Sequence, residues 1–381
     1  GVVMKQALFR SLIFALLWAG FADVSVTAQE KPSEAMDRIR SHCITILEQA
    51  MKSENAFIRS AAARAAGESE DPALISFLKK AAQDSYHTTR LFALQGMKTI
   101  STAEARSLAL RMTRDQNVWV RGAAVEMLGD LGDGASGKFI RPYLEAPDRA
   151  VRYAAAGALF KLGDRSELDV LLDGIKGGNS TDRYQAIGYL GKIGTEEVTP
   201  YLVRLLEDEE DEIVFYSLKA ISKNVDKSIL ARLTQLTGHH NPSVRYQSAL
   251  VLGELGGVSG LETLRSLCSD SDSMVRLSAA VALSRRGSDD CQDVFVAALK
   301  NPDYAIRSTA ARVLGKTELP SREQLLAIAL GDKNIRVRTS ATRAVGMMGG
   351  HKAFQLLLNR LEDSEEVVRA YAAGNLIKVM K

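Results

Sequence analysis

The stretch Asp272-Ser273-Met274-Val275-Arg276-Leu277-Ser278-Ala279-Ala280-Val281-Ala282-Leu283 recurs, with variation, along almost the whole sequence. We call the place of its Arg276 the zero position of a repeat. The counterparts are Arg59, Arg90, Arg121, Arg152, Arg183, Phe215, Arg245, Arg307, Arg338 and Arg369. The steps between them are 31 residues, except for steps of 32 and 30 around Phe215, which indicate one residue gained and one lost there. Such a period over eleven copies is typical of a solenoid, in which each unit buries its apolar face against its neighbours.

Each copy predicts two helices. The residue four places before the zero position is Asn or Asp in nine of the eleven copies, as expected for the N-cap of a helix. Val or Ile, Ala and Leu then recur at −1, +3 and +7, which lie on one face of an α-helix. A Gly often follows at +8, where we expect the chain to turn. A second apolar stretch precedes each cap, so each repeat reads as helix A, a short turn and helix B.

The unit Asp/Asn-x-x-Val-Arg-x-x-Ala-x-x-x-Leu-Gly is clearest in residues 117–129, 241–253 and 303–315. It resembles HEAT repeats, in particular the short bacterial type of the phycobilisome lyases, and the resemblance covers residues 34–381. It implies an all-α, right-handed α-solenoid of the armadillo/HEAT type, with about eleven two-helix repeats of 31 residues and B helices on the concave side. It says little about function, because this fold hosts many roles.

The first 28 residues do not belong to the repeats. Lys5 and Arg10 precede a short apolar run, residues 12–21, and Val26-Thr27-Ala28 places small residues at −3 and −1 of a cleavage site. This pattern predicts a secretory signal peptide, residues 1–28, cleaved after Ala28, then a short segment 29–33 and the solenoid 34–381. We therefore expect a periplasmic or secreted protein with no stable membrane span, since the run is short for one. The alternative is an uncleaved anchor or a buried first helix.

The sequence contains none of the motifs that carry common chemistry. A net charge of +3 is too small to indicate a nucleic-acid partner. No His is followed by Glu, so the His-Glu metal motifs of the HEAT-like deoxyhypusine hydroxylases are missing, and we find no HExxH, phosphate loop or nucleophile elbow. We interpret His239-His240 as a polar turn, since no third ligand can be named. We therefore expect no catalytic residue, cofactor or metal.

The three cysteines, Cys43, Cys268 and Cys291, form no CxxC motif. The repeat frame places Cys268 and Cys291 on A helices of adjacent repeats, offset by about eight residues, or roughly 12 Å at helical rise. A disulfide needs Cα atoms within about 7 Å. All three are therefore interpreted as packing thiols.

Two charged features need an interpretation. We expect each recurrent Arg to bridge to the Asn or Asp cap of a neighbouring repeat, which would fix the stacking of the repeats. The acidic run 207–212 is interpreted as a solvated turn whose carboxylates favour a helix N-terminus. The alternative is a site for a cation or a basic partner.

Tyr follows the zero position in four consecutive repeats, at Tyr153, Tyr184, Tyr216 and Tyr246. This place lies opposite the apolar stripe of helix B, so the rings should face outward on the concave side. With Phe160, Lys223 and Leu250 nearby, they form the predicted partner-binding site. The alternative is that each ring packs on the next helix.

These observations favour an exported, non-enzymatic scaffold that presents a concave surface to a protein or an extended peptide. One alternative is a lyase-type enzyme or enzyme subunit related to the phycobilisome lyases, although bilin attachment in that family is cytoplasmic. Another is a structural or assembly factor of the envelope. The sequence does not identify the partner.

Overall fold

The computed structural model describes residues 32–177, 179–221, 227–255 and 257–381. Within these ranges the chain forms α-helices and short 3-10 helices and no strand, which confirms the all-α solenoid. The predicted signal peptide, residues 1–28, lies outside the described residues. None of the helices in the described part is long and apolar enough to cross a membrane.

The helices belong to two compact units, each described by itself. Unit 1 holds the described residues up to Ser101 together with Pro302–Lys316 and Pro320–Lys381, and unit 2 holds those of Thr102–Asn301 together with Thr317–Leu319. The helices of unit 1 are α2 (Pro32–Ala50), α3 (Ala56–Glu68), α4 (Ile75–Ala81), α5 (His87–Ile100), α19 (Tyr304–Leu314), α20 (Arg322–Leu330), α21 (Ile335–Met348), α22 (Gly350–Leu358) and α23 (Glu366–Val379). Those of unit 2 are α6 (Thr102–Met112), α7 (Val118–Asp130), α8 (Gly137–Ile140), α9 (Arg149–Lys161), α10 (Leu168–Ile175), α11 (Ser180–Ile193), α12 (Thr199–Arg204), α13 (Asp211–Ile221), α14 (Leu230–Leu236), α15 (Pro242–Leu255), α16 (Val258–Leu267), α17 (Ser273–Arg285) and α18 (Gln292–Leu299).

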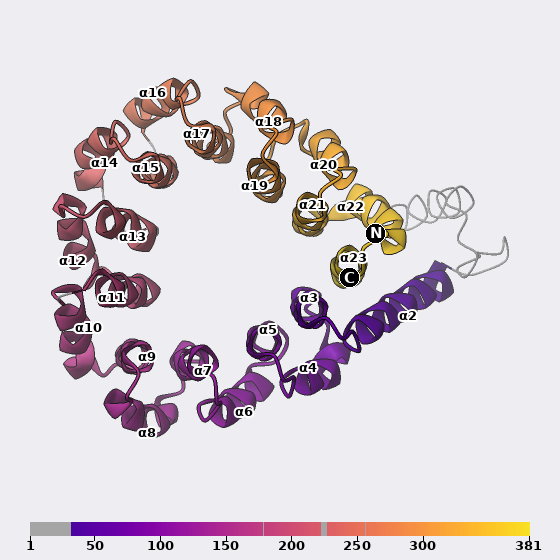
Figure 1. The fold of residues 1–381 in the computed structure, drawn as a ribbon, viewed down its shortest axis with the longest axis horizontal. Helices are drawn as coiled ribbons and strands as arrows, with labels where there is room; N and C mark the ends of the chain where they lie inside the picture. The colour runs from indigo at the N-terminus through magenta and orange to yellow at the C-terminus, as the bar shows by residue number, and fades with distance from the viewer. Residues whose placement is uncertain (1–31, 178, 222–226, 256) are drawn as a thin grey trace. The chain divides into compact units, whose positions relative to one another are not determined.

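Seven 3-10 helices extend or precede helices of the A layer: η1 (Pro72–Leu74), η2 (Gly134–Ser136), η3 (Arg141–Glu145), η4 (Arg165–Glu167), η5 (Leu205–Glu207), η6 (Lys227–Ile229) and η7 (Asn359–Glu362). In each unit the B helices form one layer and the A helices the other (Figure 1). In unit 2 the B layer runs through α7, α9, α11, α13, α15 and α17. The core lies between the layers.

The predicted caps start most B helices. Asn55 accepts a hydrogen bond from the N–H of Phe57, and Asp272 accepts from two N–H groups of its helix. The Gly at +8, in contrast, lies within a helix rather than in a turn in most repeats. A Cβ on Gly129 would come within 2.5 Å of the Cα of Ala158 on the next B helix. The residue is Gly because neighbouring B helices approach closely there.

The repeat around Phe215 has the same spacing from its neighbours as the other repeats in the structure. Helix α13 begins at Asp211, and the carbonyl of Glu210 accepts the first helical bonds, from Ile213 and Val214. The cap is therefore Glu210, and the zero position is Val214 rather than Phe215. The spacing is then 31 residues throughout, and the predicted gain and loss of a residue is wrong. Several consecutive residues of the acidic run could serve as the N-cap, so the sequence alone did not show which of them begins the helix.

Unit 1 joins the first and last repeats of the described chain. Helix α23 packs against α3 as well as α21. A Cβ on Gly374 would come within 2.3 Å of the carbonyl oxygen of Ala65, so the two helices touch backbone to backbone. Two ion pairs flank this contact, Arg343 with Glu68 and Lys378 with Glu70, the second at 2.6 Å. Each terminal B helix thus covers the apolar face of the other.

Cys268 and Cys291 form a disulfide in unit 2, with Cα atoms 6.1 Å apart. The expectation of a separation near 12 Å was wrong because Cys291 lies in the turn before α18, with a left-handed φ of 64°, and not within a helix. The turn returns to the end of α16, where Arg265 also pairs with Asp290 at 2.7 Å. Cys43 is a buried free thiol, as predicted.

Candidate functional site

An arginine–aspartate ladder connects successive repeats. Zero-position arginines pair with an Asp six residues before the next zero position, as in Arg59–Asp84, Arg183–Asp208, Arg245–Asp270, Arg307–Asp332 and Arg338–Asp363. The predicted bridge to a neighbouring repeat is confirmed for these arginines. The predicted partner, the cap residue, is wrong for most of them, but Arg121 reaches the cap Asp148 at 2.7 Å and Arg183 also reaches the cap Glu210 at 2.6 Å.

The Asp residues of the ladder also accept hydrogen bonds within the turn that precedes the next B helix. Asp332 accepts two hydrogen bonds from Arg307 and one, at 2.8 Å, from the N–H of the cap Asn334. Burial alone would raise the pKa of Asp332, but these hydrogen bonds and the Arg307 charge outweigh it and hold the pKa below its usual value. The recurrence of Asp at −6 was visible in the sequence and would have identified this partner.

At one junction of unit 2 both residues of the ladder are replaced. Val214 stands at the zero position, and His239 stands at −6 of the next repeat, where a ladder Asp is otherwise expected. The Nδ1 atom of His239 accepts the N–H of the cap Asn241 at 3.1 Å, as the Asp does elsewhere. His239 thus keeps the turn but has no arginine partner at Val214.

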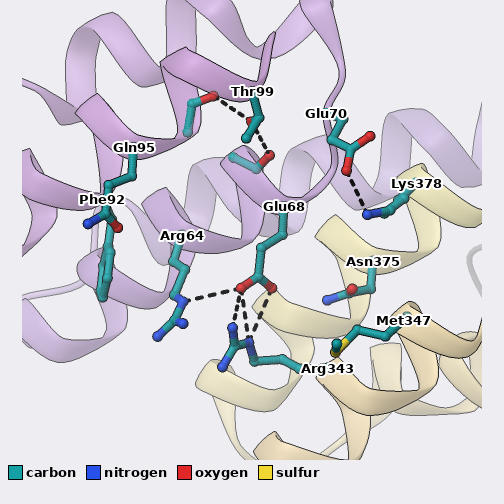
Figure 2. Close-up of a pocket in the computed structure, with 13 residues that line it drawn as sticks. Arg64, Glu68, Glu70, Phe92, Gln95, Thr99, Arg343, Met347, Asn375 and Lys378 are labelled. Atoms are coloured by element: carbon teal, nitrogen blue, oxygen red, sulfur yellow. Dashed lines mark hydrogen bonds and ion pairs between the residues drawn. The ribbon is translucent and has the colours of Figure 1, made fainter. Parts of the chain in front are cut away.

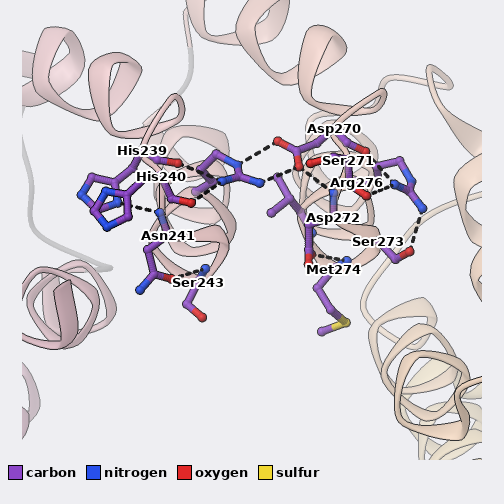
Figure 3. Close-up of polar contacts among 12 residues, drawn as sticks. His239, His240, Asn241, Ser243, Asp270, Ser271, Asp272, Ser273, Met274 and Arg276 are labelled. Carbon is purple, nitrogen blue, oxygen red and sulfur yellow. Dashed lines mark hydrogen bonds and ion pairs between the residues drawn. The ribbon is translucent and has the colours of Figure 1, made fainter.

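Asp211, the first residue of α13, lies against this interruption. One carboxylate oxygen accepts from the side-chain amide of Asn241 at 3.0 Å and pairs with the Nε2 atom of His240 at 2.9 Å. The other lies 3.7 Å from the Nε2 atom of His239. Figure 3 shows the two imidazoles side by side, their ring centroids 4.3 Å apart. The sequence-based statement that no third ligand can be named is therefore wrong.

Titration in this cluster follows its surroundings. Burial lowers the pKa of His239, and the positive charges of His240, Arg232 and Arg245 act in the same direction, against the charge of Asp211. The hydrogen bond from Asn241 and the charges of the two histidines lower the pKa of Asp211. At neutral pH the group therefore holds a carboxylate and a neutral imidazole.

The acidic run around Asp211 is mostly paired rather than freely solvated. Glu207 pairs with Arg232 at 3.0 Å, and Arg183 pairs with both Asp208 and Glu210. Most of its carboxylates therefore connect neighbouring repeats.

The predicted tyrosine row is only partly exposed. Tyr153 and Phe160 are 5% and 4% exposed and lie in the core, so the expectation that they face outward is wrong. The ring of Tyr153 turns inward because α10 carries Gly174 there: a Cβ on Gly174 would lie 2.8 Å from the Tyr153 hydroxyl. Lys223 lies outside the described residues.

The remaining tyrosines form a smaller patch. Tyr184 and Tyr216 stack across α11 and α13, with ring centroids 4.8 Å apart and an interplanar angle of 25°. Both rings are partly exposed, as are Tyr246 and Leu250 on α15. In the corrected frame Tyr216 is the second residue after the zero position, so the four tyrosines are not equivalent. We call Tyr184, Tyr216, Tyr246 and Leu250 the tyrosine face.

The surface between the B helices beside the tyrosines is filled at one end and open at the other. Tyr189 lies over Gly157, and its hydroxyl reaches Gly122 on α7, so an aromatic ring occupies that stretch. Burial raises the pKa of Tyr189, helped by the charge of Glu126. Gly188, one turn after Tyr184, is exposed and would leave an added Cβ without a neighbour within 4 Å. The open part of this surface therefore lies next to the stacked pair Tyr184–Tyr216.

Unit 1 contains a pocket of about 370 Å³ between α3 and α5 on one side and α21 and α23 on the other (Figure 2). Glu68 accepts from both Arg64 and Arg343, and Thr99 donates to the carbonyl of Gly67. Phe92 and Met347 supply apolar surface. This pocket could not be predicted from the repeat pattern, because its lining residues come from helices far apart in the sequence, α3 and α5 on one side and α21 and α23 on the other.

A model of HEAT repeats matches residues 105–184, 137–222, 229–297 and 292–377. The chain therefore belongs to the HEAT-repeat family.

Three solved structures are similar to the chain. Human deoxyhypusine hydroxylase in complex with glycerol is 17% identical over 74% of this chain and 98% of its own, with a TM-score of 0.29. An engineered protein is 15% identical over 89% and 99%, with a TM-score of 0.30. The Escherichia coli protein YibA is 17% identical over 68% and 99%, with a TM-score of 0.35. A comparison with curated proteins gives no match.

Proposed function

We propose that the chain is a non-enzymatic scaffold that binds an extended segment of another protein through the tyrosine face. The observation that carries the proposal is the stacked pair Tyr184–Tyr216, partly exposed on neighbouring B helices. Stacked rings offer a large rigid apolar area, and their hydroxyls can hydrogen-bond to a peptide. Gly188 leaves open space beside them for a partner's backbone.

We further propose that the protein works outside the cytoplasm, in the periplasm or after secretion. The N-terminal pattern of residues 1–28 supports export. The Cys268–Cys291 disulfide supports it independently, because disulfides persist in oxidising compartments and are rare in the cytosol. The closer resemblance to phycobilisome lyases and the lyase-type alternative stay predictions.

The test is a cross-linking capture from the native envelope fraction with three forms of the mature chain. These are the native form, the double variant Tyr184→Ala/Tyr216→Ala, and the control Phe57→Ala, which removes an exposed aromatic ring of unit 1. We expect one partner to be captured by the native form and by the control but not by the double variant. Circular dichroism shows whether the double variant keeps its helices.

Identical partners for all three forms, with the double variant folded, would contradict the proposed site. If the double variant loses its helical signal, the rings act as packing. Tyr184→Phe/Tyr216→Phe, which keeps the stack and removes the hydroxyls, then tests binding in a folded chain.

A further inference from the structure

We propose that Asp211, His239 and His240 bind a divalent transition-metal ion, such as Zn²⁺, between two adjacent repeats of unit 2. The three residues come from two separate places in the sequence. Asp211 begins α13, whereas His239 and His240 lie in the turn that precedes α15. One potential ligand atom from each lies within 4.8 Å of the other two.

The separations suit a tetrahedral ion. Ligand atoms at the usual Zn–N and Zn–O distances of about 2.0–2.1 Å are roughly 3.3 Å apart in a tetrahedron. The Asp211 oxygens lie 2.9 Å from Nε2 of His240 and 3.7 Å from Nε2 of His239, one distance shorter and one longer than this value. Reaching the coordination geometry requires rotation of the exposed His240 side chain and of the partly buried side chains of Asp211 and His239. Three protein ligands leave a fourth position for water.

The ligand types select the ion. Imidazole nitrogen with one carboxylate suits Zn²⁺, Ni²⁺, Co²⁺ and Cu²⁺, whereas Ca²⁺ and Mg²⁺ prefer oxygen ligands alone. The side-chain amide of Asn241 already holds the Asp211 carboxylate, as an outer partner of a metal ligand does. His240 is 78% exposed, so an ion can enter directly from solvent.

The position of the group gives an independent reason for an ion. Val214 and His239 replace the arginine and aspartate that connect repeats elsewhere in the ladder. A metal ion bound by Asp211 and the two histidines would connect the same two repeats at the place where this ion pair is missing. Metal binding should therefore stabilise the fold, because the ion binds the folded arrangement and not the unfolded chain.

One contact limits the affinity. Nδ1 of His239 accepts the N–H of Asn241, so in the neutral ring the proton resides on Nε2. Coordination through Nε2 requires the other tautomer, in which the ring proton has moved to Nδ1, so Nδ1 must release the N–H of Asn241, which water can then satisfy. We therefore expect a micromolar dissociation constant rather than the tighter binding of a preformed structural zinc site.

The test uses the full mature chain with any purification tag removed. Zn²⁺ binding is measured by calorimetry, and Co²⁺ is added separately because tetrahedral cobalt gives a visible absorption. The variants are Asp211→Asn and His240→Ala. His87→Ala, which removes a histidine of unit 1, is the control. We expect one ion per native chain, at least tenfold weaker binding for both variants, and no change for the control.

Thermal unfolding adds a second measurement. Zn²⁺ should raise the Tm of the native chain and of His87→Ala, and leave that of His240→Ala unchanged. The proposal is overturned if the native chain binds no Zn²⁺ at millimolar concentration, or if folded Asp211→Asn and His240→Ala bind it as tightly as the native chain.

Discussion

Val214 and His239 stand in adjacent repeats at the two positions where the ladder elsewhere places an arginine and an aspartate. Both departures occur at the same junction, so neither leaves an unpaired charge. Val214 is 2% exposed and packs in the core, while His239 keeps the hydrogen bond to the turn. The junction is folded without the arginine–aspartate ion pair that connects several other pairs of repeats.

The double variant Val214→Arg/His239→Asp should restore the ion pair. We expect it to be more stable than the sum of the single variants predicts, by about 1–3 kcal/mol, because each single change leaves a charge unpaired. Urea unfolding of the four forms measures this coupling. Additive single and double variants would show that the two positions do not meet.

Removing one ladder carboxylate should destabilise the protein. In Asp332→Asn the hydrogen bonds from Arg307 lose their charge, and we expect a loss of about 1–3 kcal/mol in unfolding free energy. Asp173→Asn is the matched control, because the Asp173 side chain is 80% exposed, and it should change stability by less than about 0.5 kcal/mol. Equal urea midpoints for both variants would contradict the structural role of the ladder.

The ladder also predicts acid sensitivity. The pKa values of Asp84, Asp270 and Asp332 are lowered in the fold, since hydrogen bonds and positive charges outweigh the opposing effect of burial. A lowered folded-state pKa contributes stability above the unfolded value, near 3.9, and this contribution is lost as the pH falls through the folded value. Unfolding free energy should therefore fall steeply below about pH 4. Asp332→Asn should show a shallower fall.

The helix contact at Gly374 should not tolerate a side chain. In Gly374→Ala the new Cβ meets the carbonyl oxygen of Ala65, which is backbone and cannot turn aside, so we expect a loss of about 1–3 kcal/mol. Gly188→Ala is the matched control, since its Cβ meets open space within a helix. That change should stabilise the protein by up to about 1 kcal/mol. Chemical unfolding of the two variants should thus move in opposite directions.

The cysteine pairing predicts a specific thiol count. The native chain should react with no thiol reagent at neutral pH, because Cys268 and Cys291 are paired, and burial raises the pKa of Cys43 to about 12. One thiol should appear on unfolding without reductant, and three with it. Three thiols on unfolding without reductant would show that the disulfide is absent.

The sequence predicted the repeating two-helix unit, but it did not predict most of the places where a repeat departs from that unit. The 31-residue period and the cap residues were sufficient for the two-helix repeat. The orientation of Tyr153 could not be read from its own helix, because it depends on Gly174 in the A layer. The disulfide was missed because Cys291 lies in the turn before α18 and not within a helix, and the start of α13 in the acidic run changed the repeat position of Tyr216.

Contacts beyond neighbouring repeats could not be predicted in the same way. A periodic pattern shows that each B helix packs on the next one, but it does not show what covers the first and the last. The pairing of Glu68 with Arg343 joins residues 275 apart, and neither residue departs from the charged surface pattern of its helix. The pocket of unit 1 was missed for the same reason.

The packing of α23 on α3 has a consequence for synthesis. At typical translation rates the ribosome needs tens of seconds to make the chain between Ala65 and Gly374. During that time the alanine-rich face of α3 has emerged without the helix that will cover it. The nascent chain therefore exposes apolar surface until α23 is made, and a chaperone that shields this segment would protect the molecule from aggregation.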